Sequence, residues 1–431
     1  MGKRFLKIGL IAFILLFSKT GEANGEEEML MPQGPSVVGN FTLAFQANSP
    51  LIRSNGNREK VHPFYQYLEL NAVSPKEGLS FNSYSRGRQV FSGEERSFDA
   101  YYAFLEYRNG GGTVDVRLGR QILTEGTNYY LVDGGLVKFR PTQDIEILAY
   151  AGYQDRDTHP DPEAPLISSS IYGVKLKSSE FLDSIISLGY ERINPQDFGS
   201  RDFLHLSLNR LVPFTESADF YTRGEIDVGE GDLALLTTGV GMTPYKSLHL
   251  NVEYDVSRPD GDRGDYLQDR IFDLFSVSRL HQAKTGVTYI PAKFLKTSAS
   301  YAFSRYEVSN GVRAYGHLTR LGFSWDFWRR VGLKAFQGLY YLKGRGKDEA
   351  VGVNFSVSEE ILRGLNLHYS FAFVHVETLT NKIGDAFSHA FGLQYLLIRN
   401  LLLKAEVELN DNPDFQTDTR VNLVASYDFY F

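Results

Sequence analysis

Residues 421–431 are Val-Asn-Leu-Val-Ala-Ser-Tyr-Asp-Phe-Tyr-Phe. Every second side chain of this segment is apolar, and the side chains between them are mostly polar. Because successive side chains of a strand point to opposite faces, the segment predicts a β-strand with one apolar and one polar face. Residues 112–121, 248–257 and 401–410 show the same alternation. The repeated pattern predicts an all-β fold.

Two architectures could hold such strands. A soluble sandwich buries the apolar faces between two sheets, whereas a transmembrane barrel turns them toward lipid. The alternating segments are about 10–12 residues long, enough to cross a membrane at a tilt, whereas soluble strands centre on about 5–6 residues. Aromatic residues also gather near the segment ends, as expected of girdles at the two membrane interfaces. The residues assigned to these girdles are Tyr65, Tyr67, Tyr101, Tyr102, Tyr129, Tyr130, Trp325, Trp328, Tyr340 and Tyr341. These features favour the barrel.

The alternating segments predict about 22 strands. Because boundaries taken from one sequence shift by about 2–4 residues, 20 and 18 strands remain as alternatives. The predicted strands cover residues 36–47, 63–73, 78–86, 97–108, 112–121, 133–140, 144–153, 169–178, 183–192, 202–211, 217–226, 231–242, 246–257, 279–290, 294–306, 313–325, 330–342, 347–357, 364–375, 386–398, 400–410 and 417–431. Long and short connections mostly alternate, as outer loops and periplasmic turns do in bacterial barrels. We therefore predict one large antiparallel transmembrane barrel over residues 36–431, with both termini in the periplasm.

The composition excludes several functions. The 431 residues include no cysteine, which excludes a disulfide framework, a thiolate metal site and haem attached through C-x-x-C-H in this chain. A formal charge of −7 argues against nucleic-acid binding. The hydrophobic content of 42% and mean hydropathy of −0.25 exclude a polytopic helical membrane protein but allow a barrel. The sequence lacks H-E-x-x-H, G-x-S-x-G, Walker A and Rossmann glycine motifs, so we predict no enzyme and no cofactor.

The N-terminal residues predict an export signal. Lys3, Arg4 and Lys7 precede a ten-residue apolar stretch from Ile8 to Phe17, and small residues follow up to Ala23. This order is typical of a secretory signal peptide, and the apolar stretch is shorter than the about 20 residues of a transmembrane helix. We predict a signal peptide over residues 1–23 and a short periplasmic segment over residues 24–35.

The C-terminal strand Ala425-Ser-Tyr-Asp-Phe-Tyr-Phe431 resembles the terminal signature of Gram-negative outer-membrane barrel proteins. In that class a final aromatic residue, with apolar residues at every second position before it, is recognised by the barrel-assembly machinery. Tyr427, Phe429 and Phe431 match this pattern, so the resemblance implies an outer-membrane location and this machinery as a partner. Arg117-Leu-Gly-Arg-Gln121, followed by Asp133-Gly-Gly135, is similar to strands of porin-like families that include alginate-export-type barrels. The second motif covers under a tenth of the chain and transfers no functional residues.

The polar face of the strands predicts the lining of the barrel. The charged pore-lining candidates are Asp115, Arg117, Glu253, Asp255, Arg320, Lys404, Glu406, Glu408, Arg420 and Asp428. Small side chains share this face at Ser298, Ser300, Ala302, Ser304, Ser388, Ala390 and Gly392. Charged rings set ion preference in pores, so the mixed signs predict weak selectivity, with cations favoured by the net charge. The alternative is that the wall charges only keep the interior wet and pair with one another.

One loop carries a candidate metal site. Asp260-Gly-Asp-Arg-Gly-Asp265 places the carboxylates of Asp260, Asp262 and Asp265 close together, and Ca²⁺ takes clustered carboxylate oxygens. The EF-hand pattern is incomplete because no glutamate stands at the last position of a twelve-residue loop. A solvated acidic loop is therefore the favoured interpretation, and the nine histidines are dispersed.

Three functions remain open. A polar lumen without other chemistry predicts a porin for ions or small solutes. A wide barrel without a plug domain in its sequence is architecturally similar to the barrels of porin–cytochrome conduits, in which a multihaem cytochrome fills the lumen and the barrel acts as a sheath. In general, barrels of about 16–18 strands leave an aqueous channel, whereas the lumen of transporters of about 22 strands is filled by a plug. The Arg117–Gln121 segment is the only hint of a third function, a substrate-specific polysaccharide or solute channel.

Overall fold

The computed structural model describes residues 35–48, 51–52, 58–59, 62–91, 96–123, 130–154, 169–181, 183–195, 200–212, 217–258, 279–308, 312–328, 333–344, 349–377, 383–411 and 418–431. These described residues form one 22-stranded sheet and a separate two-stranded ladder. The ladder, which the sequence did not predict, joins β2 (Leu51–Ile52) to β3 (Arg58–Glu59).

The wall strands match the predicted segments closely. Their bounds in the first half of the chain are β1 (Ser36–Asn48), β4 (Pro63–Ser74), β5 (Leu79–Val90), β6 (Arg96–Arg108), β7 (Val114–Leu123), β8 (Tyr130–Phe139), β9 (Ile145–Gln154), β10 (Ser169–Phe181), β11 (Ser184–Pro195), β12 (Arg201–Leu211) and β13 (Ala218–Asp227). Those in the second half are β14 (Asp232–Tyr245), β15 (Leu248–Ser257), β16 (Leu280–Ala292), β17 (Leu295–Val308), β18 (Val312–Trp328), β19 (Leu333–Lys343), β20 (Glu349–Leu362), β21 (Leu365–Glu377), β22 (Ile383–Ile398), β23 (Leu401–Asp411) and β24 (Asp418–Tyr430).

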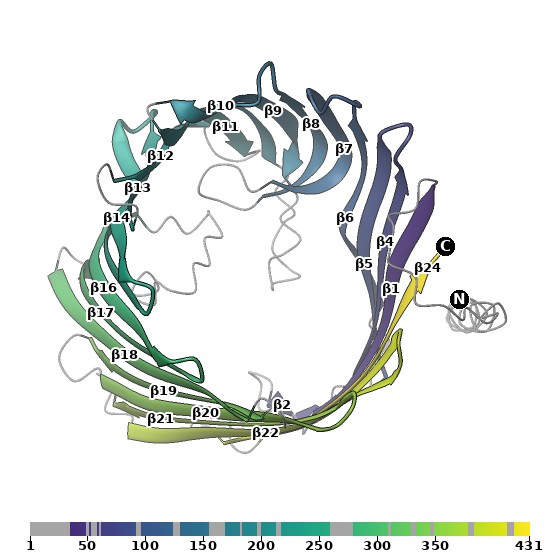
Figure 1. The fold of residues 1–431 in the computed structure, drawn as a ribbon, viewed down its shortest axis with the longest axis vertical. Helices are drawn as coiled ribbons and strands as arrows, with labels where there is room; N and C mark the ends of the chain where they lie inside the picture. Colours follow the sequence, from purple (N-terminus) through teal and green to yellow (C-terminus); the bar gives the residue numbers. More distant parts are fainter. Residues whose placement is uncertain are drawn as a thin grey trace.

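The sheet closes on itself. Each wall strand pairs antiparallel with the next along the chain, and β1 pairs on one side with β4 and on the other with β24. Figure 1 shows the resulting ring, with β24 beside β1. Phe41 stands opposite Tyr427, and Gly39 stands opposite Phe429 at this seam. Because the sheet is closed, it has no free edge with unpaired backbone groups. A wall that crosses a bilayer needs this closure, since no water can hydrogen-bond to such groups there. The predicted antiparallel barrel is therefore confirmed.

The two faces of the wall differ as the sequence predicts. Leu105, Leu118, Leu188, Val252 and Phe391 belong to a large set of exposed apolar side chains on one face. The other face carries polar groups, and there the Tyr130 hydroxyl on β8 donates a hydrogen bond to Glu191 on β11, across two intervening strands. Side chains converge in this way on the concave side of a closed sheet. The polar face is therefore the inner wall, and the apolar face surrounds the barrel, as in transmembrane barrels.

The connections give the barrel two different rims. The connections 49–62, 155–168 and 258–279 leave from one rim, which we call the loop rim. Connections such as 182–183, 246–247 and 293–294 lie at the opposite end, the turn rim. Among the described residues, no helix is long and apolar enough to cross a membrane. The wall begins and ends at the turn rim, so the periplasmic position of the termini stays a prediction that depends on the turn rim facing that side.

The predicted interfacial girdle is wrong for six of its ten members. Tyr65 and Tyr67 pair with Arg88 and Arg86 on the inner wall, and Tyr101 stacks on Tyr84 there. Tyr102, Tyr130 and Tyr340 also face inward, whereas Trp325 and Tyr341 lie on the apolar outer face. Tyr129 and the Trp328 side chain lie outside the described part. Proximity to a strand end places a residue at a depth in the membrane but does not decide which face it occupies.

Candidate functional site

The inner wall is the surface that any transported solute would meet. The structure places all ten predicted pore-lining residues on it, on strands spread around the barrel. The predicted small residues of β17 and β22 share the same face. The Arg117–Gln121 motif divides between faces, since Arg117 and Gln121 point inward and Arg120 pairs with Asp133 on the outer face at 2.6 Å. That these residues line a conducting pore stays a prediction.

A buried acid group lies on the inner wall of β11 to β13. Glu191 accepts hydrogen bonds from the hydroxyls of Tyr130, at 2.8 Å, and of Tyr150. His205 Nδ1 stands 3.2 Å from Glu225 Oε2, and its Nε2 stands 4.0 Å from Glu191 Oε1. Both glutamates are fully buried. Buried carboxylates need such partners because leaving them unpaired is strongly unfavourable, so this group ties five strands together.

The tyrosines reach Glu191 because a glycine lies beneath one of them. Gly173 on β10 stands opposite Tyr150 on one side and Glu191 on the other. A Cβ atom on Gly173 would lie 2.5 Å from the Tyr150 hydroxyl oxygen. The bare backbone at this position therefore lets the Tyr150 ring cross β10 to the acid on the next strand.

Next to this group is a small basic pocket. Its volume is about 240 Å³, and its lining includes Lys175, His205 and Arg223 with the hydroxyls of Ser187 and Ser207. The two hydroxyl oxygens are 2.5 Å apart. The inner wall therefore carries a negatively charged patch beside a positively charged one, and its charge does not keep one sign along the wall.

The predicted lining residues Glu253 and Asp255 form a second charged group. Lys284 Nζ lies 3.0 Å from Glu253 and 2.8 Å from Asp255. The Tyr221 hydroxyl donates to Glu253 at 2.7 Å, and the Thr237 hydroxyl donates to Asp255 at 2.7 Å. Lys284 thus serves as a counter-charge that Glu253 and Asp255 share.

Substituting Lys284 should change the ion preference of the pore. We expect Lys284→Met to roughly double the permeability of cations relative to anions, because Glu253 and Asp255 lose their shared counter-charge. The reversal potential of a planar bilayer held in a KCl gradient measures this ratio. Lys343→Met, which removes an exposed lysine from the outer face at the loop rim, is the matched control and should leave the potential unchanged. Equal potentials for both variants would contradict this role of Lys284.

A third charged group joins β6 and β7 near the turn rim. Arg108 Nη2 lies 3.0 Å from Glu106 and 3.4 Å from Asp115, and Arg117 Nη2 lies 3.3 Å from Glu106. Asp115 is only 1% exposed and is held between the two arginines. The charges of this group cancel in pairs, so it adds little net field to the interior.

Aromatic rings form a continuous row along the inner wall of β4, β5 and β6, which we call the aromatic track: Tyr65, Tyr67, Tyr84, Tyr102 and Phe104. Consecutive ring centroids lie 6.1, 6.1, 5.9 and 6.0 Å apart. Tyr101 stacks beside the track, 5.2 Å from Tyr84. Arg117 ends the row with its guanidinium 5.5 Å from the Phe104 ring.

The track crosses the middle of the wall. Tyr65 is the third residue of β4, which begins at the loop rim, and Phe104 is the ninth of the thirteen residues of β6, which ends at the turn rim. Arg86 lies over Tyr65 and Tyr101, at 5.8 and 5.3 Å from their ring centres, and pairs with Asp99 at 2.7 Å. The track was not predicted from the sequence, because Tyr65, Tyr67 and Tyr102 were assigned to the membrane interface. Tyr65 and Tyr67 stand an even number of residues from Glu69, a polar residue of the same strand. This spacing predicts that all three side chains share the inward face.

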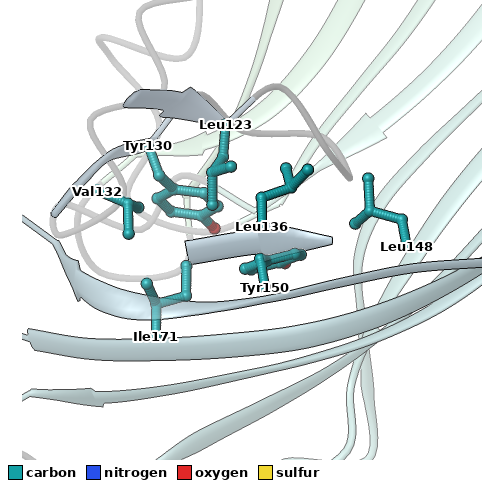
Figure 2. Packing of buried hydrophobic residues seen from close by; sticks show 7 residues of the cluster. All are labelled: Leu123, Tyr130, Val132, Leu136, Leu148, Tyr150 and Ile171. Atoms are coloured by element: carbon teal, nitrogen blue, oxygen red, sulfur yellow. The ribbon is translucent and has the colours of Figure 1, made fainter. Parts of the chain in front are cut away.

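Apolar side chains also occur on the inner wall. Among the described residues, two buried clusters lie there, and the larger consists of Leu123, Tyr130, Val132, Leu136, Leu148, Tyr150 and Ile171. Figure 2 shows these seven residues gathered around β8 and its neighbours. The smaller cluster contains Leu280, Ala302, Tyr306, Ala314 and Leu318. Neither cluster was predicted from the sequence, because only polar and small side chains were assigned to the inward face.

The remaining predicted sites are placed as follows. Asp260, Asp262 and Asp265 lie outside the described residues, as do residues 1–34 with the predicted signal peptide. Within the described ranges, no group of three or more His, Asp or Glu side chains could hold a metal ion. Tyr427 and Phe429 lie on β24 at the closing seam, both 8% exposed, and Phe431 follows the strand. Their recognition by the assembly machinery stays a prediction.

Comparison with known proteins gives a likeness of fold. No protein-family model matches the sequence, and no curated protein matches it. The structure is similar to OccK7 (OpdD) of Pseudomonas aeruginosa, with 10% identity, a TM-score of 0.45 and coverage of 92% of this chain and 99% of that one. OccAB4 of Acinetobacter baumannii has 8% identity, a TM-score of 0.45 and coverage of 93% and 99%. A BenF-like porin of Pseudomonas fluorescens Pf-5 has 12% identity, a TM-score of 0.45 and coverage of 92% and 99%. Likenesses of this size identify neither a family nor a solute.

Proposed function

We propose that this protein is an outer-membrane porin that lets ions and small polar solutes cross through its lumen. The observation that carries the proposal is the closed antiparallel wall with an apolar outer face and a charged inner face. A barrel with such faces inserts in a bilayer and encloses a wet interior. The predicted export signal and the aromatic C-terminal strand support an outer-membrane location for it.

The size of the barrel supports a channel rather than a solid anchor. In small barrels of about 8 strands the side chains fill the interior, porins of about 16–18 strands leave an aqueous channel, and the lumen of transporters of about 22 strands is filled by a plug. The described residues give 22 strands, and apart from β2 and β3 every described strand belongs to the wall. Charged groups such as Lys284 with Glu253 and Asp255 would keep this interior hydrated, because charges are stable only where water or a counter-charge solvates them.

Single-channel recording tests the proposal. Purified protein that is folded, as shown by its faster migration on an unheated detergent gel, should conduct in discrete steps in a planar bilayer. The steps should show weak ion selectivity, because the inner wall mixes both signs. Folded protein that inserts but does not conduct would contradict the porin function.

Purification from the native outer membrane distinguishes a porin from a sheath around a cytochrome. The chain should purify from its native outer membrane under mild detergent without haem absorbance, because the porin needs no partner in its lumen. Haem that co-purifies in a fixed ratio would favour the sheath function and make the barrel an insulating sleeve.

A further inference from the structure

We propose that the aromatic track is a binding path for neutral oligosaccharides, which would move along it as they pass through the barrel. The inference rests on the proposed porin function and assigns its substrate class. It is carried by one juxtaposition: five aromatic rings from three adjacent strands, each within about 6 Å of the next, continuous along the inner wall.

The first three rings of the track are stacked on one another. Tyr67 is tilted by 13° from Tyr84, and Tyr65 by 27° from Tyr67, so the rings overlap as offset stacks. Each tyrosine rises from the inner wall, which puts its hydroxyl group at the end farthest from the backbone. The track therefore presents a row of hydroxyl groups with partly exposed ring surface between them. A phenolic hydroxyl both donates and accepts hydrogen bonds.

A sugar chain matches this row of groups. A sugar ring has hydroxyl groups at its edge and C–H groups on its faces, so it can satisfy the hydroxyl row and contact the aromatic carbon at once. Consecutive sites of the same kind let a chain exchange one contact for the next, so no single site holds it tightly. Conduction needs such repeated binding that is favourable enough to enter and weak enough to leave.

The charge beside the track decides between neutral and anionic chains. Arg86 is paired with Asp99, and Arg117 and Arg108 share Glu106. The Tyr102 hydroxyl also donates to Glu69 at 3.3 Å. Arg86 and Arg117, whose guanidinium groups lie on rings of the track, thus each face a carboxylate that would repel a uronate chain. The balance favours a substrate without charge.

The experiment is block of the open-channel current by defined sugars. Maltohexaose and cellohexaose, added separately to a conducting bilayer, supply α-linked and β-linked neutral chains, and a mannuronate hexamer supplies the anionic one. We expect at least one neutral hexaose to interrupt the current more strongly than the uronate does. Glucose alone should interrupt it far less, because it spans one site of the track.

Variants of the track show where the sugar binds. Tyr84→Ala removes the central ring and should weaken the sugar block by about tenfold, because the row is then interrupted between Tyr67 and Tyr102. Tyr84→Phe keeps the stack and removes only the hydroxyl, so it should fold like the wild type and still lose part of the affinity. Tyr340→Ala, an inward tyrosine of β19 outside the track, is the matched control and should leave the block unchanged.

Several results would overturn the substrate assignment. These are a stronger block by the uronate, no block by either neutral hexaose, or equal loss of block in the Tyr84 and Tyr340 variants. All of them require a conducting channel, so they are distinct from a protein that does not conduct, which contradicts the porin function itself.

Discussion

Replacing Gly119 by alanine is expected to destabilise the barrel by about 3 kcal/mol, because the backbone at this position is one that L side chains avoid. Gly119 has φ +126° and stands opposite Phe104 in the β6–β7 pair. A Cβ atom there would lie 2.3 Å from the backbone oxygen of Ala103 and 3.0 Å from the Cα of Phe104. Both neighbours are backbone atoms held by the ladder, so the clash can be relieved only by moving the strands apart.

The measurement is a urea titration of protein folded into lipid vesicles, with Gly189→Ala as the control. Gly189 also lies on the inner wall, but its Cβ would meet Val174 and Lys175 only at 3.4 and 3.6 Å, which are ordinary contacts. We expect the unfolding midpoint to fall for Gly119→Ala and to stay near the wild-type value for Gly189→Ala. Equal midpoints for the two variants would show that β7 adapts to the side chain.

The strand pattern was predictable from the sequence because a barrel wall is a local repeat. Each strand contacts mainly its two neighbours in the chain, and lipid outside and water inside impose alternation on every strand. Even β18 (Val312–Trp328) and β24 (Asp418–Tyr430) lie within a few residues of the predicted segments 313–325 and 417–431. The two-residue strands β2 and β3 were missed because such short strands carry no alternation.

The contents of the inner wall were less predictable, since they depend on pairs of strands. Alternation indicates that Glu253 faces inward, but not that Lys284 on the next strand holds it together with Asp255. The continuity of the aromatic track was not predictable for the same reason, because Tyr67 and Tyr84 become neighbours only when the register of β4 and β5 is known. Some apolar residues, such as Leu136 and Ile171, also face inward. Their positions were not predictable from the alternation, because it assigns apolar side chains to the outer face.

Replacing Glu191 is the second substitution with a large expected effect, although two terms oppose each other. Removing a buried carboxylate relieves its desolvation, which stabilises the folded protein. Glu191→Ala, however, leaves the buried hydroxyls of Tyr130 and Tyr150 without their acceptor and opens a space beside His205. Each hydrogen bond lost from a buried charged acceptor contributes about 1–3 kcal/mol of destabilisation. We expect the lost hydrogen bonds to outweigh the relieved desolvation, with a net destabilisation of about 3 kcal/mol.

Two further substitutions separate the hydrogen bonds from the charge. Glu191→Gln keeps a side chain of the same shape with one acceptor oxygen, so its unfolding midpoint in vesicles should fall much less than that of Glu191→Ala. Glu253→Ala removes another inner-wall acid that accepts a tyrosine hydrogen bond, but the Glu253 side chain is 21% exposed and water in the lumen can replace it. Its effect should be about 1 kcal/mol or less. If Glu191→Ala proved as stable as Glu253→Ala, relief of desolvation would outweigh the lost hydrogen bonds, and the acid group would have to be retained for a reason other than holding β8 to β13 together.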